Sequence, residues 1–163
     1  HPATLPPEAP PVDESVASVL VSARRAYATG EADRCREQLA TLDLPALLAR
    51  GNRAAAARAL ALDTACAYQG LAREDAARIA AQLAVLGLDL PADAVAREAE
   101  DLIVAAIAAA SAASRAKLEV TGVTGARVSV DGRPATCVTP CPLELVAGDH
   151  VISVDAEPMW FEI

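Results

Sequence analysis

The sequence has few aromatic side chains with which to build an apolar core. Its 163 residues include two tyrosines, one tryptophan and one phenylalanine, although 53% of the residues are hydrophobic. Much of that hydrophobic fraction is alanine, whose methyl group contributes little apolar area when it is buried. Helices made from this sequence must therefore pack closely against one another. The length predicts one or two small domains.

Clusters of basic residues are also lacking. The chain has 14 Lys and Arg residues against 22 Asp and Glu residues, which gives a formal net charge of -8. Binding to nucleic acid or to an anionic membrane surface needs grouped Lys and Arg side chains. The charge balance therefore argues against both kinds of partner, and an acidic surface of this kind usually serves solubility.

No hydrophobic run is long enough to span a membrane. The most apolar stretch, residues 102–113, is mostly alanine, and it falls far short of the roughly 20 apolar residues that a spanning helix needs. We interpret it as part of a packed helix that caps the helical region. A glycine-rich phosphate-binding loop and a cluster of metal ligands are missing as well, and we expect no cofactor and no metal.

The two histidines are the residues that raise the question of catalysis. His150 lies beside Asp149 in an alternating apolar segment, and no nucleophile is placed with it, so we interpret it as structural. His1 could bind copper through its amine and ring, with His150 as second ligand, as in oxidative polysaccharide-cleaving enzymes. A proline-rich segment follows His1 and disfavours a rigid site. We expect a noncatalytic protein.

The start of the chain is unlike a packed element. Residues 1–13 are rich in proline and poor in large apolar side chains, which predicts an extended tether. The chain begins with His1 rather than Met, and its start lacks the charged and apolar parts of a signal peptide. We therefore interpret it as a processed or engineered form.

From residue 14 to about residue 115, apolar residues recur at the three- and four-residue spacing of helices. Asp13 or Ser15 can cap the first helix, and Gly30 ends it. Pro91 and Asp93 are start signals for the last helix. Between these two helices we expect helices over residues 31–42, 54–70 and 73–87, with a turn over residues 44–53.

Two parts of the helical region are similar to each other. Residues 23–45 and 63–91 each contain an Ala-Tyr pair near a helix end, a tight turn, an acidic second-helix start and a closing Leu-Pro. This arrangement resembles the tetratricopeptide repeat, although the second unit begins about 42 residues after the first instead of the usual 34. The resemblance implies antiparallel helix pairs that bind an extended partner, with the last helix as a cap.

At Lys117 the apolar period changes from 3.6 to 2. The pairs Leu118/Val120 and Leu143/Leu145 show the alternation, and the dipeptide Asp131-Gly132 is a strong signal for a tight turn. Four or five short antiparallel strands are therefore predicted after residue 116.

The β segment resembles the PEGA domain, a small β-sandwich module of bacterial surface and envelope proteins. Gly125-Ala126 begins the strand motif GA-x-V-x-V-D-G, Thr139-Pro140 matches the TP motif, and Ala147-Gly148 stands at the turn that names the family. Together the patterns predict an α+β protein. A TPR-like helical domain of about five helices over residues 14–115 precedes a PEGA-like antiparallel β-sandwich over residues 116–163.

Two cysteines flank the Thr-Pro motif. Cys137 and Cys141 have the spacing Cys-x-x-x-Cys, whereas a structural zinc site or a thioredoxin-type centre would use Cys-x-x-Cys. We expect a disulfide between them, which would stabilise so small a loop by about 2 kcal/mol. The alternative is a pair of free thiols.

The other two cysteines lie in the predicted second and third helices. A Cys35–Cys66 disulfide would close a loop of about 30 residues and contribute about 3 to 4 kcal/mol. Four cysteines allow three pairings, and their placement in separate domains selects this one; the alternative is that both are small buried hydrophobic residues. Local pairing of an even number of cysteines predicts export to the periplasm or cell surface.

These features favour a noncatalytic bacterial envelope scaffold or adaptor that binds a protein or peptide partner. The first helix of each pair would line the concave binding face. The predicted partner-binding residues are Ser22, Arg25 and Thr29 on the first helix and Arg58 and Gln69 on the third.

The alternative function is binding of carbohydrate or peptidoglycan through the β module. Sugar binding uses exposed aromatic rings, and the candidates are Trp160 and Phe161, just past the last predicted strand.

Overall fold

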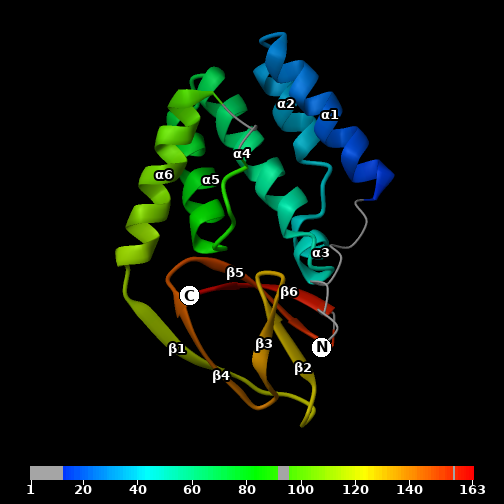
Figure 1. The fold of residues 1–163 in the computed structure, drawn as a ribbon, viewed down its shortest axis with the longest axis vertical. Coiled ribbons are helices and arrows are strands. Elements are labelled where there is room, and N and C mark those ends of the chain that lie inside the picture. Colours follow the sequence, from blue (N-terminus) through cyan, green and yellow to red (C-terminus); the bar gives the residue numbers. More distant parts are fainter. Residues whose placement is uncertain (1–12, 92–95, 156) are drawn as a thin grey trace, which may run out of the picture.

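The computed structural model describes residues 13–91, 96–155 and 157–163 of the chain. These residues form six helices followed by six antiparallel strands, which confirms the predicted α+β class. The helices make one layer and the strands lie beneath it (Figure 1). The predicted tether, except Asp13, lies outside the described residues, and so do His1 and Asp93.

Five of the six described helices correspond to segments that we predicted to be helical. The bounds of all six are α1 Glu14–Ala28, α2 Ala32–Leu39, α3 Leu44–Ala49, α4 Arg53–Gln69, α5 Arg73–Val85 and α6 Arg97–Ala112. The N-cap of α1 is Asp13, whose carboxylate accepts a hydrogen bond from the Ser15 backbone N–H at 3.1 Å. None of the described helices is long and apolar enough to cross a membrane.

The helix α3 replaces the turn that we predicted over residues 44–53. Asp43 caps this helix by accepting a hydrogen bond from the Ala46 backbone N–H at 2.9 Å. Pro45 lies in its first turn, where a missing backbone N–H costs no helical hydrogen bond. A proline that we interpreted as following one helix therefore begins the next.

The helix α4 is the centre of the helical layer. It contacts each of the other five described helices, and eleven of its 17 residues are buried. Seven of these eleven are alanines, so the neighbouring helices can approach its backbone closely. Because an alanine side chain buries little area, the layer gains stability by surrounding one helix on several sides.

Six strands form two sheets. Their bounds are β1 Arg115–Val120, β2 Arg127–Val130, β3 Arg133–Val138, β4 Cys141–Val146, β5 Asp149–Val154 and β6 Glu157–Glu162. One sheet pairs β1 with β4, and the other has the order β3-β2-β5-β6. An apolar cluster contains residues of both sheets, among them Val128, Ile152 and Leu143. The strand β6 lies beyond the predicted strands.

The strand β5 faces both layers. Successive side chains of a strand point to opposite faces; Val151 belongs to the core cluster of the helices, whereas Ile152 belongs to the cluster of the sheets. Both residues are about 1% exposed. The helices α3 and α5 contact β5, and α3 also contacts β6. The helical layer thus rests on β5 and β6 of the four-stranded sheet.

Glycine permits a close approach between the layers. Gly132 has φ +77° and lies in the turn between β2 and β3. A Cβ atom at this position would lie 2.8 Å from the Leu48 carbonyl oxygen of α3 and 3.0 Å from Cγ of Arg53. A side chain there would have to push the sheet away from the helices.

Both predicted disulfides are present. Cys35–Cys66 joins α2 to α4 and spans 31 residues, whereas Cys137–Cys141 joins the ends of β3 and β4 and spans 4. The first bond lies in a cluster with Ala23, Ala26 and other buried residues of α1, α2 and α4. It therefore holds the first helix pair against the central helix.

We predict that the long-range disulfide stabilises the fold more than the short one. In the loop-entropy description, a 31-residue loop corresponds to about 3.7 kcal/mol and a 4-residue loop to about 1.9 kcal/mol. The Cys35→Ala/Cys66→Ala variant should therefore unfold at lower urea concentration than Cys137→Ala/Cys141→Ala. Equal losses of unfolding free energy in the two variants would contradict this ranking.

We predict that Gly132→Ala destabilises the protein more than Gly125→Ala does. Both glycines have positive φ, which costs a non-glycine residue about 1–2 kcal/mol. A Cβ at Gly125 meets nothing within 4 Å, so this variant measures the backbone cost alone. Gly132→Ala adds the clash with Leu48, and we expect a further loss of about 1–3 kcal/mol in urea unfolding. If the two variants unfold at the same urea concentration, the contact between Gly132 and Leu48 contributes nothing to stability.

Candidate functional site

Three of the predicted partner-binding residues lie together on α1. Ser22, Arg25 and Thr29 line a small pocket of about 160 Å³ between α1 and α2. Glu31 and Arg34 complete its charged wall, and they form an ion pair with each other at 3.0 Å. The Thr29 hydroxyl lies 2.7 Å from a Glu31 carboxylate oxygen. This pocket is small and polar.

The two predicted residues of α4 are far apart. The Gln69 side-chain amide donates a hydrogen bond to the Tyr27 carbonyl at 3.3 Å, which places it beside the end of α1. Arg58 is exposed eleven residues earlier on α4, or about 16 Å along the helix axis. The structure therefore groups Gln69 with the α1 residues and separates Arg58 from them.

A larger groove lies between α2 and α4. Its volume is about 590 Å³, and we call it the α2–α4 groove. Its apolar residues are Leu39, Ala40, Leu42, Leu44, Ala59 and Leu60, and its charged residues are Asp33, Arg36, Glu37 and Asp63. None of these was among the predicted site residues.

Arg36 is the structural centre of the groove. Its guanidinium group contacts Asp63 of α4 at 3.3 Å and Asp75 of α5 at 2.9 Å. Burial raises the pKa of Asp63 despite the neighbouring Arg36, whereas the hydrogen bond from Arg36 lowers the pKa of Asp75. One cation of α2 thus ties together two acidic side chains from two other helices.

The remaining carboxylates of the groove face solvent. Asp33 and Glu37 are exposed one helical turn apart on α2, and neither forms an ion pair within the described part of the chain. The sequence signal for this face was the segment 31–38, where charged residues surround Cys35. The Cys35–Cys66 bond turns this part of α2 toward α4, and the groove forms from side chains of α2, α3 and α4 together.

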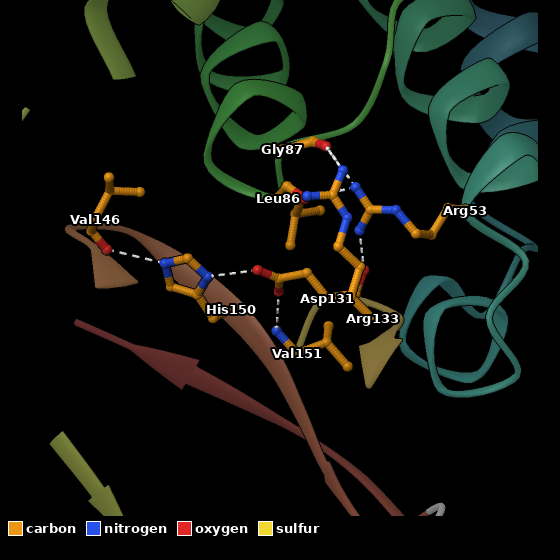
Figure 2. Close-up of polar contacts among 8 residues, drawn as sticks. All are labelled: Arg53, Leu86, Gly87, Asp131, Arg133, Val146, His150 and Val151. Carbon is orange, nitrogen blue, oxygen red and sulfur yellow. Dashed lines mark hydrogen bonds and ion pairs between the residues drawn. The ribbon is translucent and has the colours of Figure 1, made fainter. Parts of the chain in front are cut away.

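A second group of polar side chains joins the helical layer to the sheet (Figure 2). The guanidinium group of Arg53 donates hydrogen bonds to the carbonyl oxygens of Asp131, Leu86 and Gly87. Arg133 donates to the same Gly87 oxygen at 3.2 Å. Burial and the neighbouring positive charge of Arg133 lower the pKa of Arg53. Both arginines thus bind carbonyl groups at the end of α5, where the helix dipole favours cations.

His150 and Asp131 form a buried pair next to these arginines. The Nδ1 atom of His150 lies 2.8 Å from Oδ2 of Asp131, and Nε2 lies 2.9 Å from the Val146 carbonyl oxygen. The other carboxylate oxygen of Asp131 accepts a hydrogen bond from the Val151 backbone N–H at 2.9 Å. His150 is 1% exposed. Its charged partner is Asp131 rather than its sequence neighbour Asp149.

The geometry favours a protonated imidazole. A carbonyl oxygen only accepts hydrogen bonds, so Nε2 of His150 must carry a proton to bond Val146. The carboxylate oxygen of Asp131 likewise accepts, so Nδ1 carries a proton as well. Burial opposes the positive charge, but the hydrogen bonds to Asp131 and Val146 outweigh it and raise the pKa of His150.

These groups also line a pocket of about 480 Å³ between the two layers. Arg53, Arg115 and Arg133 give it a local excess of positive charge in an acidic protein. Carbonyl groups of the chain already occupy donors of Arg53 and Arg133, and both ring nitrogens of His150 are engaged. We therefore interpret this cluster as the structural joint of the two layers.

The two predicted sugar-binding residues lie in β6. Trp160 is directly opposite Val151 in the register, and Phe161 is directly opposite His150. Directly opposite side chains share a face, and successive side chains alternate between faces. Trp160 and Phe161, each 41% exposed, therefore point to opposite sides of the sheet and do not form one stacking platform.

Comparison of the chain with models of protein families, with curated proteins and with solved structures found no match. The resemblances to the tetratricopeptide repeat and to the PEGA domain therefore stay predictions.

We predict that the pair of His150 and Asp131 makes stability fall as the solution becomes alkaline. Because folding raises the pKa of His150, its contribution is complete below the unfolded value of about 6.5 and is lost as the pH rises through the folded value. Urea unfolding at pH 6 and pH 9, flanking about 6.5, should show a lower midpoint at pH 9.

The matched variant is Asp131→Asn. Its amide keeps an oxygen for the Val151 N–H and offers an N–H to a neutral His150, so the variant should be less stable at pH 6 and lose most of the dependence on pH. If the urea midpoint falls between pH 6 and pH 9 in Asp131→Asn as much as in the wild type, other groups cause the dependence on pH.

Proposed function

We propose that this chain is a noncatalytic adaptor that holds a peptide of a partner protein in the α2–α4 groove. The observation that carries the proposal is the composition of that groove, which combines an apolar floor with exposed carboxylates in about 590 Å³. Apolar surface supplies most of the free energy of binding, and charged groups at the rim select the partner.

The charges of the groove favour a basic peptide. Arg36 is already bound to Asp63 and Asp75, so its charge is compensated within the protein. Asp33 and Glu37 leave two negative charges exposed on the α2 side. A partner segment with leucine-like side chains for the floor and Lys or Arg side chains for the wall would complement both features.

The proposed compartment is the periplasm or surface of a bacterial cell. Two disulfides and no free cysteine among the described residues fit an oxidising environment, because thiols are kept reduced in the cytosol. The resemblance of the helical and β segments to tetratricopeptide and PEGA modules supports the same location.

The residues predicted on α1 offer a second, smaller surface. Its 160 Å³ pocket holds Arg25, and Glu31 already neutralises Arg34 there, so it would suit an acidic side chain. The carbohydrate alternative retains two exposed rings, Trp160 and Phe161, each of which could stack on a sugar separately.

We predict that peptides selected from a random display library on the immobilised protein are enriched in Lys or Arg next to large apolar residues. A selected peptide should bind the Asp33→Lys/Glu37→Lys variant at least about tenfold more weakly, measured by fluorescence anisotropy. Two lost attractions and two new repulsions at a partly exposed site account for a change of this size.

The control for this experiment is Glu98→Lys/Asp101→Lys. It makes the same change in net charge on exposed positions of α6, outside the groove. If both variants bind the peptide equally weakly, the change in net charge explains the loss and the groove does not. Loss of peptide binding only in Arg25→Glu/Arg58→Glu would move the site to the first predicted surface. Binding to purified peptidoglycan that is abolished by Trp160→Ala/Phe161→Ala, without any peptide binding, would favour the alternative function.

A further inference from the structure

We propose that two copies of this chain associate through the strand β6, which pairs antiparallel with its own copy. This strand lies at the edge of the four-stranded sheet, and all six of its residues are exposed. Three consecutive large apolar side chains lie in it: Met159 is 48% exposed, and Trp160 and Phe161 are each 41% exposed. An apolar edge strand is a template for pairing with another strand.

The register of β6 against β5 shows which backbone groups are unused. Gly148 and Ile163 exchange two backbone hydrogen bonds. Along an antiparallel pair of strands, hydrogen-bonded and non-hydrogen-bonded residue pairs alternate, so this pair fixes the pattern for all of β6. Phe161, Met159 and Glu157 therefore turn their N–H and C=O groups toward β5. The groups of Pro158, Trp160 and Glu162 point outward, where no described strand pairs with them.

The outward groups are complementary to those of an identical strand. If Trp160 lies opposite Trp160 of the second copy, the two residues exchange a pair of backbone hydrogen bonds. Each Glu162 N–H then reaches the Pro158 carbonyl of the other copy. Proline has no N–H to donate, and here its position requires only its carbonyl oxygen. A two-fold axis through this point gives a closed, isologous contact.

The side chains are complementary in the same register. Each Met159 lies opposite Phe161 of the other copy, which forms two contacts between a thioether and an aromatic ring. Each Glu162 lies opposite Pro158, and each Glu157 lies opposite Ile163, so no two carboxylate side chains face each other. This self-complementarity favours a second copy over an unrelated strand as the occupant. The two four-stranded sheets would become one of eight strands, within the usual range.

The experiment measures mass and tryptophan emission against concentration. Light scattering after gel filtration should give twice the 16.7 kDa of one chain as the concentration rises. Trp160 is the single tryptophan of the sequence, so its emission should shift to shorter wavelength over the same range. Each copy carries a net charge of -8, so two copies repel each other. Raising the salt concentration from about 0.05 to about 0.5 M shortens the range of this repulsion and should favour the dimer.

Charge variants at Trp160 test the register itself. Trp160→Lys and Trp160→Glu each place like charges opposite each other, so each variant alone should require at least tenfold higher concentration to dimerise. An equimolar mixture of the two should recover the dimer, because Lys then faces Glu. Val123→Lys is the control, since Val123 is another exposed apolar residue of the β region, 82% exposed, and this variant should dimerise like the wild type.

Three results would overturn the proposal. The first is that the wild type stays monomeric at about 1 mM, a concentration far above the micromolar range of ordinary weak association. The second is that both Trp160 variants dimerise as readily as the wild type. The third is that an equimolar mixture of the two variants does not dimerise. Far-UV circular dichroism of each variant distinguishes loss of strand pairing from loss of folding. A variant that misfolds is replaced by Trp160→Thr, for which we expect the same tenfold weakening of dimerisation.

Discussion

Asp131 is the residue on which the contact between helices and sheet depends, because its carboxylate joins β2 to β5 and its backbone carbonyl oxygen binds α4. It lies in the tight turn after β2 with φ +52°, a conformation that aspartate adopts more readily than most residues. One of its oxygens binds the Val151 N–H of β5 and the other binds the His150 ring. Its own carbonyl oxygen accepts a hydrogen bond from Arg53 of α4. One residue thus fixes strands and helices relative to each other.

The surrounding residues explain why a charge can be buried at this place. A buried carboxylate is costly unless it is fully hydrogen-bonded, and Asp131 has both a backbone N–H and an imidazole as partners. The turn brings Gly132 against α3, where its missing side chain allows contact with Leu48. The same contact positions Arg53 to bind the end of α5. This polar joint adds to the apolar contact that Val151 makes with the core cluster of the helices.

The sequence predicted the features that depend on local pattern. The change of period at residue 117 located the boundary between α6, which ends at Ala112, and β1, which begins at Arg115. The separation of cysteines into two regions selected both disulfides, and Asp13 was a recognisable cap. Each of these follows from residues close together in the chain or from a count.

Features that depend on tertiary neighbours were missed. Pro45 fits both the end of one helix and the start of another, and only the fold shows that α3 forms. Asp131 and His150 are 19 residues apart, and Asp149 was the nearer candidate. The strand β6 has no turn signal of its own and three apolar residues in succession, so period-2 alternation did not reveal it. The α2–α4 groove also contains Leu44, which lies in the helix α3 that the sequence pattern did not predict.

The two proposed surfaces belong to different layers, and this determines how they would act together. The α2–α4 groove lies in the helical layer, whereas β6 is the edge of the sheet beneath it (Figure 1). The helix α3 contacts β6 and contributes Leu44 to the groove, so pairing through β6 would fix the two grooves relative to each other. A dimer would present two weak peptide sites to one partner. A partner with two suitable segments would then bind through effective concentration, which can strengthen attachment by about 10² to 10⁴ without any new contact.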